Sequence, residues 1–136
     1  MLSKRHSDLL AAFERKVLRR IVGPICEEGR FRRRYNHELY AIYLEADIVT
    51  KIKLGRLRWA GHLARMSEEE PARKVLCGTF YGRRQRGRPC LRWRDGVDQD
   101  ARSLGVRNWI ALAQDRYRWK DLLKEARTGP RLSSRR

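Results

Sequence analysis

An arginine-rich block is the part of the sequence whose residue types and spacing best suit a chemical role. Residues 77 to 94 hold six arginines and no acidic residue: Arg83, Arg84, Arg86, Arg88, Arg92 and Arg94. A guanidinium donates two parallel hydrogen bonds to a phosphate and also stacks on flat rings. Acidic residues flank the block at 67–70 and 95–100, so its positive charge is locally concentrated. The block predicts contact with a polyanion.

Residues 82 to 89, GRRQRGRP, form a short motif within this block. It resembles the core of an AT-hook, in which two arginines, here Arg86 and Arg88, enter the narrow minor groove of AT-rich DNA. The alternative is a loop that contacts phosphates without sensing groove shape. We favour this alternative because Leu91 and Trp93 follow directly and tie the segment to a folded helix.

Asp95, Asp98 and Asp100 form an acidic cluster that suggests a metal-dependent nuclease. Asp95 and Asp98 lie one helical turn apart among arginines, so ion pairing with neighbours explains them more simply. Those neighbouring arginines are Arg92, Arg94 and Arg102. A stand-alone nuclease is kept as an alternative function.

The spacing of histidines and cysteines argues against a metal site. The sequence has no C-x-x-C pair, no H-x-x-x-H pair and no G-x-x-x-x-G-K-[ST] phosphate loop. The candidate ligands lie far apart: His6, His37, His62, Cys26, Cys77 and Cys90. We expect no metal and no cofactor.

The overall charge points to the same kind of partner as the arginine block. The 136 residues carry 33 basic and 16 acidic side chains, a formal net charge of +17. Such a chain repels itself unless salt or a polyanion screens the charge. Apolar runs are too short to span a bilayer, and three unpaired cysteines suit a reducing compartment. We expect a nuclear or cytoplasmic protein that binds nucleic acid, is not secreted and contacts no membrane.

Hydrophobic periodicity predicts a mainly α-helical fold, a small bundle of about four to five amphipathic helices. It divides the chain into an N-terminal helix (1–24), a basic helical domain (25–126) and a disordered basic tail (127–136). Ser7 is expected to cap the first helix, while residues 25–35 are irregular or form a hairpin. Asn36 is expected to cap a short helix that ends near Ala46. Pro89 is expected to open a later helix after the arginine-rich loop, and Asn108 to cap one last helix that ends before Gly129.

The strongest helix is predicted over 48–66, with Asp47 as its cap. One apolar face carries Ile48, Ile52, Gly55, Trp59, Leu63 and Met66, and a second strip carries Val49, Leu57, Ala60 and Ala64. Lys51, Arg58 and Arg65 recur every seven residues, so they form one basic stripe. Tryptophans beside arginines can stack on bases. We favour core packing for Trp59, Trp93 and Trp119 because they lie on apolar faces.

Three separated blocks together resemble the C-terminal part of non-LTR (LINE-type, jockey-like) retrotransposon endonuclease and reverse transcriptase proteins. The blocks are DIVTKIKLGRLRWAGHLARM (47–66), RRQRGRPCLRW (83–93) and LGVRNWIALAQDRYRW (104–119). The resemblance spans roughly residues 15 to 126. Gly55 stands where relatives commonly have a basic residue, and Cys90 where they have lysine or another polar residue.

The resemblance implies an accessory region that follows the polymerase and helps to hold template RNA or target DNA. The polymerase's aromatic-x-Asp-Asp motif is absent from this sequence, so we expect no enzyme activity and an upstream reverse transcriptase domain as partner. For backbone contact it implies Lys51, Arg58 and Arg65, with a main clamp of Arg83, Arg84, Arg86 and Arg88, and Arg92 beside it. A non-functional transposon relic is a further alternative.

Replacing Arg83, Arg84, Arg86 and Arg88 together by glutamate is expected to weaken binding to RNA and duplex DNA and to flatten its salt dependence. Each lost phosphate contact removes about 0.7 to 0.9 from the slope of log affinity against log salt. A fluorescence-anisotropy salt titration measures this slope. Unchanged binding by the quadruple variant would make the clamp assignment wrong.

Overall fold

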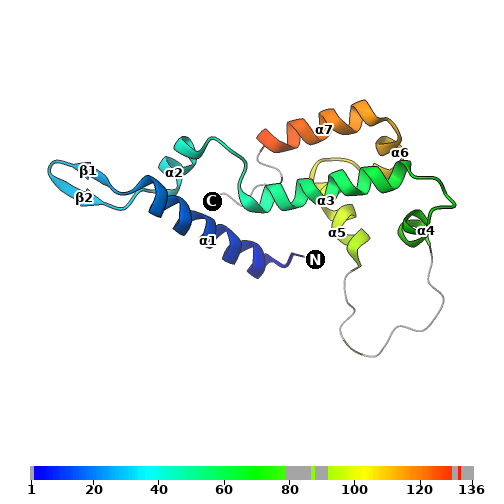
Figure 1. The fold of residues 1–136 in the computed structure, drawn as a ribbon, viewed down its shortest axis with the longest axis horizontal. Coiled ribbons are helices and arrows are strands. Elements are labelled where there is room, and N and C mark those ends of the chain that lie inside the picture. Colours follow the sequence, from blue (N-terminus) through cyan, green and yellow to red (C-terminus); the bar gives the residue numbers. More distant parts are fainter. Residues whose placement is uncertain (1, 79–86, 88–91, 130–131, 133–136) are drawn as a thin grey trace.

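A computed structural model of the chain describes residues 2–78, 87, 92–129 and 132, and confirms the mainly helical prediction (Figure 1). Within those residues a short hairpin accompanies seven helices. The elements are α1 (Lys4–Val22), β1 (Ile25–Glu27), β2 (Arg30–Arg32), α2 (Asn36–Tyr43), α3 (Ile48–Arg65), α4 (Pro71–Cys77), α5 (Trp93–Ser103), α6 (Trp109–Gln114) and α7 (Arg116–Thr128). Among the described helices, none has the length and apolar character needed to cross a bilayer.

The N-cap of helix α1 lies four residues before the expected cap. Ser3, not Ser7, is the N-cap, and its Oγ accepts a hydrogen bond from the His6 N–H at 3.2 Å. The Ser7 hydroxyl instead donates to the Ser3 carbonyl from within the helix. The predicted end at Gly23 is confirmed, because Gly23 has a φ of 75° and its N–H donates to the Arg19 carbonyl. Glycine reaches this left-handed region without a Cβ clash.

Strands β1 and β2 form the hairpin that the sequence left as one of two alternatives for residues 25–35. Glu27 pairs with Arg30, so only Glu28 and Gly29 connect the strands. Both residues have positive φ, 51° and 77°. Two-residue turns of this kind match the right-handed twist of paired strands, and glycine makes them accessible. The hairpin projects at the end of the molecule away from α4 (Figure 1).

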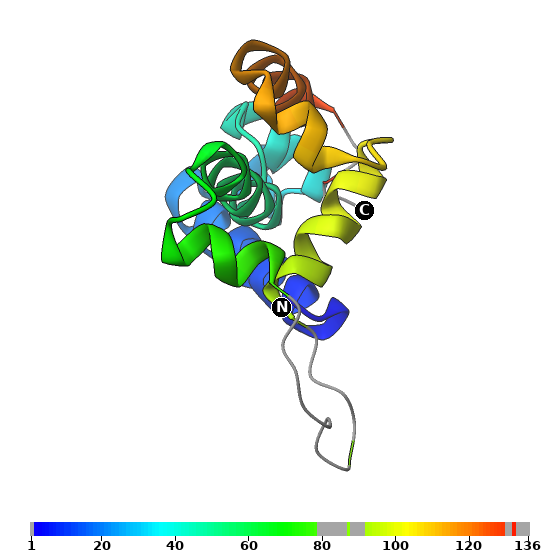
Figure 2. The ribbon, with the colours of Figure 1, turned by 90° about the vertical axis from the view of Figure 1, so that its right-hand side faces the viewer.

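Helix α3 is the central element, and its cap is the predicted one. The buried Asp47 carboxylate accepts a hydrogen bond from the Thr50 N–H at 2.8 Å. Viewed nearly along α3, helices α4, α5, α6 and α7 lie around it (Figure 2). These helices and α1 contact α3, so one side of α3 supplies much of the core.

The buried side of α3 corresponds to the second apolar strip rather than to the first. Buried residues of the helix include Val49, Leu57, Ala60 and Ala64, together with Leu54 and Leu63. On the first face, Ile48, Ile52 and Trp59 are exposed. The expectation that this apolar face is packed is wrong for these three residues, because the surrounding helices gather on the other side.

The last predicted helix is two helices in the structure. The chain breaks at Asp115, whose carboxylate accepts hydrogen bonds from the N–H groups of Tyr117 and Arg118 and caps α7. The break allows Trp109 of α6 and Trp119 of α7 to be buried together, with ring centroids 6.3 Å apart. One straight helix would point residues ten positions apart in different directions.

Two helix boundaries next to residues outside the described part of the chain also differ from the sequence interpretation. Helix α5 begins at Trp93, and Pro89, the expected start, lies outside the described residues. Helix α7 continues to Thr128, so Arg127 and Thr128 are helical rather than part of a tail. Leu132 is fully buried and its carbonyl accepts a hydrogen bond from Lys53 Nζ at 3.1 Å. The disordered-tail prediction is therefore wrong at these positions; residues 130–131 and 133–136 lie outside the described part.

Helix α3 approaches the Trp119 side chain of α7 closely at Gly61. A Cβ atom on Gly61 would overlap the indole of Trp119, whereas one on Gly55 would meet nothing within 4 Å. Only a residue without a side chain allows α7 to pack at this distance.

Gly61→Ala is expected to lower the free energy of unfolding by about 1 to 3 kcal/mol, because the added methyl group overpacks the Trp119 site. Gly55→Ala, on the exposed side of the same helix, serves as the matched control and is expected to raise it by up to about 1 kcal/mol through helix propensity. Urea unfolding followed by circular dichroism measures both. A neutral or stabilising Gly61→Ala would contradict this packing.

Candidate nucleic-acid interface

The acidic cluster at 95–100 is used for structure. Asp100 is buried and pairs with Arg56, whose Nε and Nη2 donate to one carboxylate oxygen at 3.0 and 2.5 Å. Asp98 accepts a hydrogen bond from the Trp109 Nε1–H at 2.6 Å, and Asp95 accepts one from the Arg92 backbone N–H. The prediction that Asp95 and Asp98 form ion pairs with neighbouring arginine side chains is therefore wrong: the partners that the structure gives are a backbone N–H and an indole N–H. No cluster of three or more His, Cys, Asp or Glu side chains suited to a metal ion occurs in the described parts of the chain.

The basic stripe of α3 is partly engaged in internal contacts. Lys51 Nζ donates to the Tyr43 hydroxyl at 3.0 Å and lies 3.6 Å from a Glu45 oxygen; the Tyr43 hydrogen bond in particular raises the pKa of Lys51. Arg65 Nη1 donates to the Ala113 carbonyl at 2.7 Å, which ties α3 to α6. Arg58 is exposed to solvent. Of the three residues, Arg58 is best placed to reach a ligand.

The remaining predicted contact residues lie at or beyond the edge of what is described. Arg92 is exposed at the start of α5, beside a largely apolar hollow between α3, α4 and α5. The proposed clamp falls outside the described residues: Arg83, Arg84, Arg86 and Arg88. Its assignment stays a prediction.

The tryptophans divide between core and surface. Trp119 is buried, as predicted, but Trp59 and Trp93 are 55% and 42% exposed. The core interpretation is wrong for these two residues. Trp59 lies against the ring of His62, with centroids 5.2 Å apart, and Arg58, the preceding residue of α3, is also exposed. An aromatic ring therefore accompanies the accessible arginine of this helix.

A second basic region, which sequence analysis did not assign, lies where α1 meets the hairpin. A hollow of about 450 Å³ opens there. We call it the hairpin pocket, and its lining residues are Lys16, Arg19, Gly23, Pro24, Phe31, Arg32, Arg33 and Arg34. Every charged side chain in this lining is basic.

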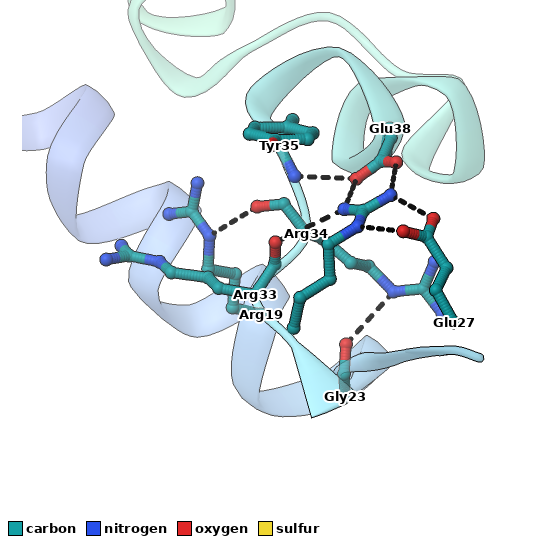
Figure 3. A network of polar contacts seen from close by, with 8 residues as sticks. Arg19, Gly23, Glu27, Arg33, Arg34, Tyr35 and Glu38 are labelled. Atoms are coloured by element: carbon teal, nitrogen blue, oxygen red, sulfur yellow. Dashed lines mark hydrogen bonds and ion pairs between the residues drawn. The ribbon is translucent and has the colours of Figure 1, made fainter. Parts of the chain in front are cut away.

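Hydrogen bonds to the backbone hold two of the pocket arginines in place (Figure 3). Arg34 Nε donates to the Gly23 carbonyl at 3.0 Å, beyond the C-terminal end of α1. Arg19 Nε donates to the Arg34 carbonyl at 3.1 Å, and its Nη2 donates to Asn36 Oδ1 at 2.7 Å. A cation at the C-terminus of a helix is favoured by the helix dipole. These neutral acceptors position the guanidinium groups without cancelling their charge.

Arg32 is the neutralised member of the group. Its guanidinium bridges Glu27 and Glu38, with Nη2 at 2.5 and 2.7 Å from their oxygens, and lies 4.7 Å from the centre of the Tyr35 ring. Glu38 also accepts a hydrogen bond from the Tyr35 N–H. The Arg32 hydrogen bonds are the main reason why the pKa of Glu38 falls to about 2. This network joins the hairpin to the start of α2.

The other positive charges of the pocket reinforce one another. Partial burial, followed by the like charges of Arg33 and Arg15, lowers the pKa of Arg19. The nearby carboxylates are used elsewhere: Glu27 and Glu38 hold Arg32, and Glu14 accepts from Tyr40 and from the Ile48 N–H. Among the described residues, no ion pair or side-chain hydrogen bond involves the side chains of Lys16 or Arg33. Its charge and its available donors make the pocket a candidate anion site.

The sequence contained a signal for this site. Four arginines, Arg30 and Arg32 to Arg34, surround Phe31 directly after a turn-forming Gly29. Lys16 and Arg19, the other cations of the pocket, belong to the preceding helix α1 and lie outside this local pattern.

Comparison with protein-family models, curated proteins and solved structures finds no match for the chain.

The pKa of Glu38 provides a direct measure of the Arg32 network. A carboxyl whose pKa is lowered on folding stabilises the fold above its unfolded pKa, near 4.5, and loses that contribution as the pH falls toward 2. We expect a carbon-13 NMR titration of Glu38 with a midpoint near 2, and a midpoint near the ordinary value in Arg32→Gln. Equal midpoints in both proteins would contradict the network.

Proposed function

We propose that this chain binds RNA or DNA through its basic surface and serves as an accessory module to a larger nucleic-acid enzyme. The observation that carries the proposal is the hairpin pocket, where Lys16, Arg19, Arg33 and Arg34 meet and no carboxylate of the described residues forms an ion pair with them. Nucleic acids are the cellular polyanions whose phosphates match several such groups at once, and arginine binds phosphate in a two-pronged geometry.

The distribution of charge over the rest of the described chain supports this proposal. The described ion pairs involve five basic residues: Arg32, Lys51, Arg56, Arg118 and Arg127. Most of the basic side chains in the described part of the chain therefore lie outside these ion pairs. Binding a polyanion relieves the resulting repulsion by neutralising the surface and releasing counterions.

We further propose that the chain is the C-terminal region of a non-LTR retrotransposon reverse transcriptase and acts beside that polymerase in the nucleus or cytoplasm. Two of the three sequence blocks that suggest this family pack together: Arg65 and Ala64 of block 47–66 bond to Ala113 and Gln114 of block 104–119. This packing is consistent with their belonging to one structural unit. A reverse transcriptase reading frame directly upstream in the genomic DNA is the expected finding; intact unrelated sequence there would refute the origin.

Removing two charges from the hairpin pocket tests the binding function. The Lys16→Gln/Arg33→Gln variant is expected to bind labelled RNA and DNA about ten-fold more weakly and to show a salt slope flatter by about 1 to 2, since two phosphate contacts are lost. Neither side chain takes part in a described internal contact, so the fold should persist. Fluorescence anisotropy at several salt concentrations measures both quantities.

The matched control removes the same charge from another surface. Lys120 and Lys124 are exposed one turn apart on α7, and the Lys120→Gln/Lys124→Gln variant is expected to change affinity by less than about two-fold. Equal losses in the two double variants would mean that net charge alone drives binding. No binding by the parent chain to RNA or DNA at moderate salt would refute the proposed function.

A further inference from the structure

Phe31 is the apolar feature of an otherwise cationic pocket. It lines the hairpin pocket, yet 77% of its surface is exposed. It pairs across the hairpin with Cys26, which is also exposed. Successive side chains of a strand point to opposite faces, so Phe31 lies on the other face from Arg32 and its two carboxylates. Its ring lines the same hollow as Lys16, Arg19, Arg33 and Arg34.

An exposed aromatic ring next to cationic side chains distinguishes single-stranded from duplex nucleic acid. The bases of a duplex are stacked on one another and offer no free face to a side chain. An unpaired base stacks on an aromatic ring while basic groups hold the adjoining backbone. A duplex would use the cations of the pocket but leave Phe31 in water.

The hairpin pocket has the volume of a small-molecule site. Its volume of about 450 Å³ falls in the range of small-molecule sites, roughly 300 to 1,000 Å³. Lys16 and Arg33 carry hydrogen-bond donors that no described contact uses. Arg19 bonds to Arg34 and Asn36 through Nε and Nη2, and no described hydrogen bond uses its Nη1. Base and phosphate thus have separate partners within the same hollow.

We infer that the hairpin pocket binds an unpaired nucleotide of an RNA or DNA strand, with the base on Phe31 and the phosphate between Lys16 and Arg33. The inference rests on the proposed nucleic-acid binding and adds a preference for single strands at this site. Because stacking is tolerant of base identity, the pocket selects the unpaired state rather than a sequence.

Replacing the ring tests the inference. Phe31→Ala is expected to weaken binding to a fluorescein-labelled ten-nucleotide uridine RNA and to the matching thymidine DNA by about ten-fold, in line with the loss of one base-stacking contact. Affinity for a blunt duplex of the same length should change by less than about two-fold. Phe31→Tyr retains an aromatic face and should restore single-strand binding.

A matched aromatic control is available outside the pocket. Tyr117 of α7 is 81% exposed, and Tyr117→Ala should leave single-strand affinity unchanged. Thermal melting followed by circular dichroism checks that each variant is folded; the exposure of Phe31 predicts little change.

The outcomes separate this inference from the proposed function. If the parent binds nucleic acid but Phe31→Ala binds single strands equally well, or loses single-strand and duplex affinity equally, the inference is overturned and the function stands. If the parent binds neither form, the proposed function fails. If Phe31→Ala instead reduces co-sedimentation with phosphatidylserine-containing vesicles and leaves single-strand affinity intact, the ring serves a lipid surface and the inference is overturned.

Discussion

Packing against one side of α3 is the constraint on which the rest of the structure depends. Helices α1, α4, α5, α6 and α7 all contact α3, and the largest cluster of buried residues includes the buried side of this helix. A chain with 36% charged residues has little apolar surface to bury, so one shared helix is an economical way to form a core. The absence of a side chain at Gly61 is what allows Trp119 of α7 to join that core.

The small number of carboxylates determines where positive charge stays available. Asp47, Asp95, Asp98, Asp100 and Asp115 all accept hydrogen bonds that cap helices or join them. Glu27 and Glu38 converge on a single arginine. None of the ion pairs among the described residues involves Lys16, Arg19, Arg33 or Arg34. A polyanion is the partner that such a surface favours.

The candidate site shows which of its features a local sequence pattern can predict and which it cannot. The sequence predicted arginine as the residue type that would bind a ligand, and the structure adds a place where helix α1 and the hairpin bring such residues together. The stripe of α3 was recognised from its spacing of seven, but spacing carries no information about Tyr43 or Ala113, which engage Lys51 and Arg65. Whether a cation is free depends on acceptors that arrive from distant parts of the chain.

The sequence by itself determined the helical class, the caps at Asp47 and Asn108, the end of α1 at Gly23 and the excess of positive charge, because capping, periodicity and charge are properties of neighbouring residues. Only the tertiary structure decided which apolar strip of α3 is buried, that Trp59 is exposed while Trp119 is enclosed, and that Asp115 divides the last helix. Two strips of similar hydrophobicity are equivalent along an isolated helix. The choice between them is made by the other helices, whose positions depend on contacts between residues far apart in the chain.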